Sequence, residues 1–180
     1  MINKTNGPTR PSRKDFYFNA IKGRPSAEVF HGIFCVYSLL EKRMDEFFRP
    51  HNLTPVKFNA LMLIKFMGQG EGISQNDLGY HMIVTPSNIT RLVDRMTKDG
   101  YISRVPAAHD RRVNLIHITP AGEEIIRTVF FGFSEMIQQS VYLLERKEVE
   151  QLSGLLMKWF FKLEAVMDGS TANGSKDPQK

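Results

Sequence analysis

The sequence predicts a mainly α-helical protein with one small β-hairpin, and three features support this fold class. Apolar residues recur at intervals of three and four along six segments of the 180-residue chain. Two short β-like runs stand together between positions 101 and 118. Thr-Pro pairs begin three of the helical segments, as expected for an N-cap followed by the first helical position. A chain of this length holds one domain of ordinary size with tails.

The first two predicted helices precede the hairpin by some distance. The first covers residues 27–49, where the apolar positions keep helical spacing until the stretch "RPHN" ends it. The second begins with Thr54 as N-cap and Pro55 at the first helical position, and glycines end it.

Two shorter helices and the hairpin follow. Ser74 begins the first of these helices, and Asp77 stands three residues later, which is close to a capping box. The next helix covers residues 85–100, and strands are expected at 101–105 and 113–118. Two short helices joined by a tight turn and followed by a hairpin are the layout of a winged helix-turn-helix domain.

A long helix from residue 120 and a last helix that ends near residue 167 complete the predicted fold. Glu123 and Glu124 stand near the positive end of the long helix's dipole. Residues 1–26 are expected to form a flexible basic arm, and residues 168–180 a disordered tail.

Composition and charge restrict the class of protein. No segment has the ~20 consecutive apolar residues of a membrane span, and the N-terminus lacks the apolar core of a secretory signal. The single cysteine cannot form an internal disulfide and predicts a cytoplasmic location. Residues 1–27 hold six cations against one acid, and residues 85–112 hold six against three. Two basic patches on a slightly acidic body favour a polyanionic partner.

The predicted helix at 85–100 has two different faces. Ile89, Leu92, Val93 and Met96 form one apolar stripe, which has to pack inward. The opposite face carries short hydrogen-bonding side chains first and cations later: Ser87, Asn88, Thr90, Arg91, Arg95 and Lys98. A helix in a DNA major groove meets base edges with its first turn and phosphates with its later cations. The alternative is an ordinary exposed helix face, although such a face usually mixes charges of both signs.

Residues on both sides of this helix extend the predicted DNA surface. Thr85 precedes the helix, and Ser74 and Gln75 begin the helix before it, where backbone N–H groups and short polar side chains can hold a phosphate. Asp110 and Arg112 stand two residues apart between the strands and point the same way if the segment is extended. Asp110 is then expected to brace Arg112 for insertion into the minor groove. The alternative is a solvated hairpin tip.

The stretch from "ISQNDLGY" to "TPAGEEI" resembles the MarR family of bacterial winged-helix transcription regulators. The matching features are "TRLVDRMTKDGYI", the "DRR" between the strands and the pattern L-x-x-I-T-x-x-G after it. The resemblance covers about residues 27–167. It implies a winged-helix regulator domain there, with a DNA-binding part at about 54–119 and interlocking dimerisation helices at about 27–49 and 120–167. It also implies that Arg112 is the inserted arginine and that Arg111 lies nearer the DNA backbone.

The resemblance further implies a small effector, expected to be aromatic or phenolic, bound between the dimerisation helices and the DNA-binding part. The candidate residues for this site are His31, Phe34, Cys35, Phe58 and Met62. One branch of the family senses peroxide through a cysteine in the first helix, so a redox-switched regulator that uses Cys35 is the alternative. Cys35 lies closer to the helix end than in that branch, and an inert buried cysteine is the other interpretation. His31 fits either an effector contact or a structural histidine.

The predicted function is therefore a sequence-specific DNA-binding transcription regulator, in its simplest form a repressor. It is expected to bind a pseudo-palindromic operator as a homodimer and to be released by the effector. An enzyme is not expected, because the sequence has no Gly-rich phosphate loop and no nucleophile with a base. The five histidines lack metal-ligand spacing, so neither a metal nor another cofactor is expected.

Overall fold

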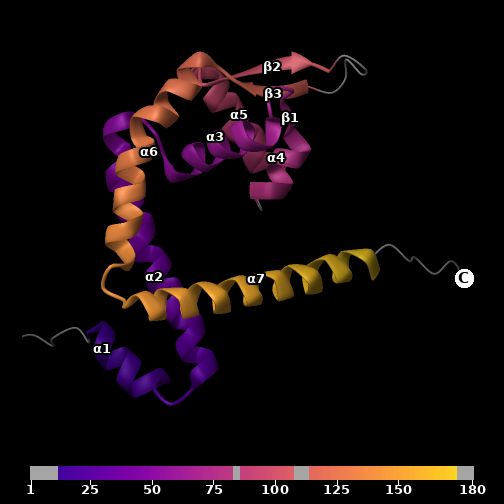
Figure 1. Cartoon of the computed structure of the whole chain (residues 1–180). Helices are drawn as coiled ribbons and strands as arrows, with labels where there is room; N and C mark the ends of the chain where they lie inside the picture. Colours follow the sequence, from indigo (N-terminus) through magenta and orange to yellow (C-terminus); the bar gives the residue numbers. More distant parts are fainter. Residues whose placement is uncertain (1–11, 83–85, 108–113, 174–180) are drawn as a thin grey trace, which may run out of the picture. The chain divides into compact units, whose positions relative to one another are not determined.

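The computed structural model describes residues 12–82, 86–107 and 114–173 (Figure 1). The helical elements are α1 (Arg13–Phe16), the π-helical turn Tyr17–Ile21, α2 (Pro25–Phe48), the 3-10 turn Arg49–His51, α3 (Pro55–Gly68), α4 (Gln75–Met82), α5 (Pro86–Lys98), α6 (Pro120–Val141) and α7 (Arg146–Asn173). The strands are β1 (Ile73–Ser74), β2 (Ile102–Pro106) and β3 (Asn114–Ile118). The chain divides into two compact units, Met1–Phe130 and Phe131–Lys180, and α6 crosses the boundary.

The strands form an antiparallel sheet in the order β1-β3-β2. Ile116 at the centre of β3 pairs with Ile73 of β1 on one side and with Arg104 of β2 on the other. The hairpin was predicted, whereas β1 was not. With only two residues, β1 is too short to show the alternation that marks a strand in a sequence.

The core of the first unit lies between α3, α4, α5 and the sheet, which gather at one place in Figure 1. Its fully buried members include Leu61 of α3, Leu78 of α4, Val93 and Met96 of α5, and Ile116 of β3. Helices α4 and α5 followed by the hairpin confirm the mainly α-helical, winged helix-turn-helix fold class. Among the described helices, none is both long and apolar enough to cross a lipid bilayer.

The structure corrects two expectations at the ends of the chain. Residues Arg13–Ile21 lie in the expected flexible arm but are helical. Ser12 and Asp15 form a reciprocal capping box that begins this segment, and hydrogen bonds from the backbone and hydroxyl of Ser12 lower the pKa of the Asp15 carboxyl. Ile21 is buried at its end.

At the other end, α7 continues to Asn173, into the expected disordered tail of residues 168–180. The tail carries no proline before Pro178, and proline is the residue that most strongly stops a helix. Composition alone, rich in Gly, Ser and Asn there, therefore placed the end of the helix too early.

Candidate DNA-binding surface

Helix α5 shows the two faces that its sequence predicts. Ile89, Val93 and Met96 are buried against the core, and Leu92 beside them is half-buried. The remaining predicted DNA-facing residues of α5 are all exposed: Ser87, Asn88, Thr90, Arg91, Arg95 and Lys98. The burial pattern confirms the apolar stripe as the inward face of the helix.

The exposed residues of α5 separate further into a flank and a far face. At 100° per residue, Thr90 lies beside the buried stripe, and Asp94, one turn later, lies between Thr90 and Ser87; Thr90 and Asp94 form the flank of the helix. Ser87, Arg91 and Lys98 lie roughly opposite the buried stripe, and Arg95 and Asn88 extend this far face on the side away from Thr90. The far face therefore combines two short polar side chains with three cations, and Asp94 lies at its edge beside Ser87.

The flank of α5 is hydrogen-bonded to its neighbours. Gln75 Nε2 at the start of α4 donates to Thr90 Oγ1 at 2.9 Å. Arg104 Nη2 on β2 donates to Asp94 Oδ1 at 2.5 Å and completes an ion pair. Both pairs line an open hollow of about 360 Å³, and the other residues around it are Ser74, Asn76, Asn114 and Ile116.

Ser74 caps helix α4. Its hydroxyl accepts a hydrogen bond from the Asp77 backbone N–H at 3.1 Å and donates one to Asp77 Oδ2 at 2.6 Å. The near-capping box that the sequence predicts is thus present, and the hydroxyl of Ser74 already has two partners. A phosphate contact by Ser74 and Gln75 stays a prediction.

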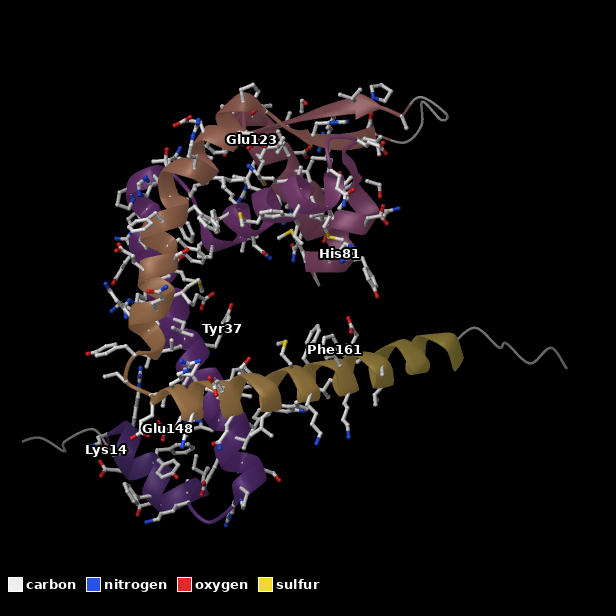
Figure 2. The ribbon with its side chains drawn as sticks, viewed as in Figure 1. Lys14, Tyr37, His81, Glu123, Glu148 and Phe161 are labelled. Carbon is white, nitrogen blue, oxygen red and sulfur yellow. The ribbon has the colours of Figure 1, made fainter. Side chains whose placement is uncertain are left out.

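Two further ion pairs connect α3 to the ends of neighbouring helices. Lys57 Nζ lies 2.7 Å from Asp99 Oδ2, just after α5, and both side chains are mostly buried. Lys65 pairs with Glu123 in the first turn of α6 (Figure 2). Neither pair could be predicted from the sequence, because the partners lie 42 and 58 residues apart.

Four predicted DNA-binding residues lie outside the described residues: Thr85, Asp110, Arg111 and Arg112. Their roles at the start of α5 and between β2 and β3 stay predictions.

The candidate effector residues have different environments. Cys35 Sγ lies 3.3 Å from His31 Nε2, one turn earlier on α2, and the Phe16 ring packs against His31 at 5.1 Å between centroids. Phe34 is exposed and packs against Phe30. Phe16 was not among the predicted effector-site residues, because it lies in the segment that was expected to be flexible.

The two candidates on α3 differ in burial. Phe58 is buried in the core with its ring against Phe48, at 4.9 Å between centroids, whereas Met62 is half-buried. A core position makes Phe58 a poor candidate for contact with a ligand. Among the described residues, no group of three or more His, Cys, Asp or Glu side chains is placed to hold a metal ion.

The MarR family model matches residues 51–113, which span α3, α4, α5 and β2. The HTH-type transcriptional repressor IacR of Pseudomonas putida is 26% identical over 137 residues, which cover 76% of this chain and 80% of that protein. The structure of a putative MarR-like transcription regulator from Bacillus cereus superposes with a TM-score of 0.68 at 28% identity, over 78% of this chain and 99% of that one. A mutant MarR from Escherichia coli, complexed with operator DNA, has the same fold, with a TM-score of 0.67 at 24% identity over 77% and 95% of the two chains. The sequence match, the fold and these relatives together support a MarR family winged-helix regulator.

Proposed function

We propose that this chain is a DNA-binding transcription repressor. It binds a pseudo-palindromic operator as a homodimer and is released by a small aromatic or phenolic effector. The far face of α5 carries the proposal, because it is an exposed row of hydrogen-bonding and cationic side chains on a helix whose opposite face is buried. The solved relative with operator DNA and the repressor IacR support this function. Both are regulators by name, which agrees with the expectation that the chain is not an enzyme.

The distribution of side chains assigns the contacts. Ser87 and Asn88 lie in the first turn of α5 and make the base contacts, since Asn can bond adenine with two hydrogen bonds. Arg91, Arg95 and Lys98 follow at helical spacing and contact phosphates or guanine. Arg112 enters the minor groove with Asp110 as its brace, as the resemblance implies.

A homodimer follows from the apolar surface of the long helices. On α2, Phe30, Phe34 and Tyr37 are each more than half exposed. Helix α7 has no fully buried residue among those whose burial is described, and Leu155, Phe161 and Val166 are more than half exposed (Figure 2). Apolar surfaces of this extent mark an interface, and a second copy with two-fold symmetry is the simplest partner.

The dimer determines the form of the operator. Two-fold symmetry presents two copies of α5 to one face of the duplex, so the half-site centres should lie about one helical turn, ~10 bp, apart. The operator should then be a pseudo-palindrome.

The effector site is proposed for the exposed apolar side chains near His31. Phe30 and Phe34, whose rings pack against each other on α2, provide aromatic groups on the same helix as His31. Such groups favour a flat aromatic ligand, and His31 offers a ring nitrogen to a phenol or a carboxylate.

The decisive experiment selects binding sequences from random-sequence duplex DNA with the wild-type protein. An enriched pseudo-palindrome, protected over two half-sites, is the expected result. Replacing Arg91 and Arg95 with Ala should weaken binding to it by roughly 1–3 kcal/mol for each lost contact. Lys42→Ala on α2 removes one cation of a surface pair with Glu46 and serves as the control. Failure to enrich any duplex, or full affinity in the arginine variants, would contradict the proposal.

The contact between Cys35 and His31 supports oxidation of Cys35 as an alternative cause of release from DNA. The Cys35 thiol lies within hydrogen-bond reach of the His31 ring, and a partly exposed thiol is a group that an oxidant can attack. Titration of the thiol with peroxide, followed by DNA binding, separates the two triggers. Release by peroxide in the wild type but not in Cys35→Ser would replace the effector with an oxidant.

A further inference from the structure

We propose that Asp94 and Arg104 are positioning residues that fix the recognition helix α5 relative to the strands of the wing. The inference rests on the proposed DNA-binding function. It also reassigns two charged residues that the sequence places in the same basic patch. Arg104 then acts through Asp94 rather than by contacting DNA.

The geometry connects three elements through one side of α5. Asp94 lies on the flank of the helix and accepts the hydrogen bond from Arg104 at 2.5 Å. Arg104 stands at the middle of β2, where its backbone pairs with Ile116 at the centre of the sheet. Strands β2 and β3 lead into and out of the segment that carries Arg112, so the ion pair ties α5 to the wing at the level of the sheet.

A second contact holds the same flank one turn earlier. Gln75 at the start of α4 donates to Thr90, four residues before Asp94. Helix α5 is therefore held by α4 at Thr90 and by β2 at Asp94, and two points fix its rotation about its own axis. Rotation about this axis decides which far-face side chains reach the base edges.

The charge of Asp94 supports a role in positioning. Its side chain is about half exposed and that of Arg104 about one-third exposed, so the pair adds little to folding stability. A carboxylate on a helix that binds DNA also repels phosphates, which lowers affinity. Asp94 thus weakens the attraction of α5 to DNA and adds little to folding stability. A role in orienting the helix explains why an acid stands at this position.

The alternative is that Arg104 contacts a phosphate and that Asp94 is a bystander. The two cases predict opposite changes in DNA affinity for one substitution, Asp94→Asn. Under the alternative, Asp94→Asn removes a repulsive charge and frees Arg104, so binding to every duplex should tighten. Under positioning, Asp94→Asn should weaken binding to the specific site even though the protein becomes more positive.

The test measures Kd for two probes, the duplex selected by the wild-type protein and a shuffled duplex of the same composition. We expect Asp94→Asn to weaken binding to the selected duplex roughly tenfold, within the range for coupled contacting residues, and to leave the shuffled duplex unchanged or bound slightly tighter. Arg104→Gln should lower the ratio of the two affinities in the same way. The double variant should lose less than the sum of both losses, since each substitution removes the same pair.

The salt dependence gives a second readout, which a loss of stability would not move. For Arg104→Gln, the slope of log Kd against log salt should stay at the wild-type value, whereas the loss of a phosphate contact would reduce it by about one. Glu124→Gln on α6 neutralises an acid of another surface pair, with Arg127, and is the matched control. It should leave the ratio of affinities unchanged.

Tighter binding of both duplexes by Asp94→Asn, or a reduced salt slope in Arg104→Gln, would overturn the inference and leave the proposed function standing. A wild-type protein that selects no duplex would overturn the proposed function, and this inference with it. Both side chains are partly exposed, so the variants should fold; circular dichroism and sedimentation that match the wild type confirm that the loss lies in recognition.

Discussion

At the scale of single residues, the sequence predicts burial well and polar partners poorly. The apolar stripe of α5 was identified from spacing alone, because a helix places residues three and four apart on one face. The partner of Thr90 could not be identified, since Gln75 comes from another helix and its position depends on how α4 packs. Thr90 and Gln75 were predicted to contact DNA; the structure shows them bonded to each other, and their contact with DNA stays a prediction.

Gly122, in the first turn of α6, has to be a glycine because the backbone of Tyr101 lies too close for a side chain. A Cβ atom at this position would lie 2.3 Å from the backbone oxygen of Tyr101 and 2.7 Å from Ile118 Cγ1. Gly122 is the glycine of the L-x-x-I-T-x-x-G pattern, so the pattern reflects the contact between α6 and the start of the hairpin.

Gly122→Ala should therefore destabilise the protein by about 1–3 kcal/mol, because a backbone oxygen cannot move away as a side chain can. Urea unfolding measures the change. Gly79 on α4 is the matched control, since its added Cβ would meet only Ile89, at an ordinary 3.5 Å. Gly79→Ala should be neutral or stabilising by up to about 1 kcal/mol, as alanine favours a helix. Equal losses in the two variants would show that the contact with Tyr101 is not the cause.

At the scale of elements, the order of helices and the hairpin could be predicted, whereas β1 and the N-terminal helical segment could not. Helices of ten or more residues show their period in the sequence, and Thr-Pro pairs indicate where α3 and α6 begin. Strand β1 exists only because Ile73 meets Ile116, 43 residues later. The capping box of Ser12 and Asp15 was not predicted, because the surrounding basic residues indicate a disordered segment.

The hairpin that carries Asp110 and Arg112 gives the second prediction. Arg112→Ala should weaken binding to the selected duplex by roughly 1–3 kcal/mol per half-site and leave the unfolding transition unchanged. Asp110→Ala should also weaken binding, because the carboxylate holds the guanidinium in place. Tighter binding by Asp110→Ala would identify the segment as a solvated charged loop, and fluorescence anisotropy at fixed salt distinguishes the two results.

At the scale of the whole molecule, the described residues leave much apolar side-chain surface exposed, and contiguous surface of this kind marks an interface. The long helices α2 and α7 contribute most of it, with Phe30 and Phe34 on the first and Leu155 and Phe161 on the second. The sequence predicted these helices and their role in a dimer from the resemblance. Which faces of α2 and α7 would meet in the proposed dimer depends on packing between two copies, and helical spacing does not encode it.

The wild-type protein should sediment as a dimer at micromolar concentration, because α7 alone offers too little burial to stay folded in water. Trp159→Arg should shift the protein towards monomer or unfold it, since it places a charge within the apolar surface. Lys158→Glu, at the preceding position of the same helix, is the control and should remain a dimer. A stable, folded wild-type monomer would contradict the proposed assembly.

The basic residues at the N-terminus give a further prediction. Removing residues 1–11, with Lys4 and Arg10, should weaken binding to selected and shuffled duplexes alike and reduce the salt slope, because these residues act through counterion release. This deletion spares Ser12 and Phe16, which belong to the helical segment beside α2. Loss of affinity for the selected duplex only would show that the deleted residues contact bases.

The two-residue strand β1 connects the hairpin to the helix pair through main-chain hydrogen bonds. It ends at Ser74, where α4 begins, and it pairs with β3, whose other edge holds β2. Fraying of the hairpin strands therefore has to disturb the start of α4 as well. In hydrogen-exchange terms, the amides of β3 and those of α4 and α5 should open as one cooperative group, with nearly equal protection. Because of these few main-chain hydrogen bonds, the amide hydrogens of the hairpin strands should exchange as slowly as those of the domain core, and more slowly than those of its loops.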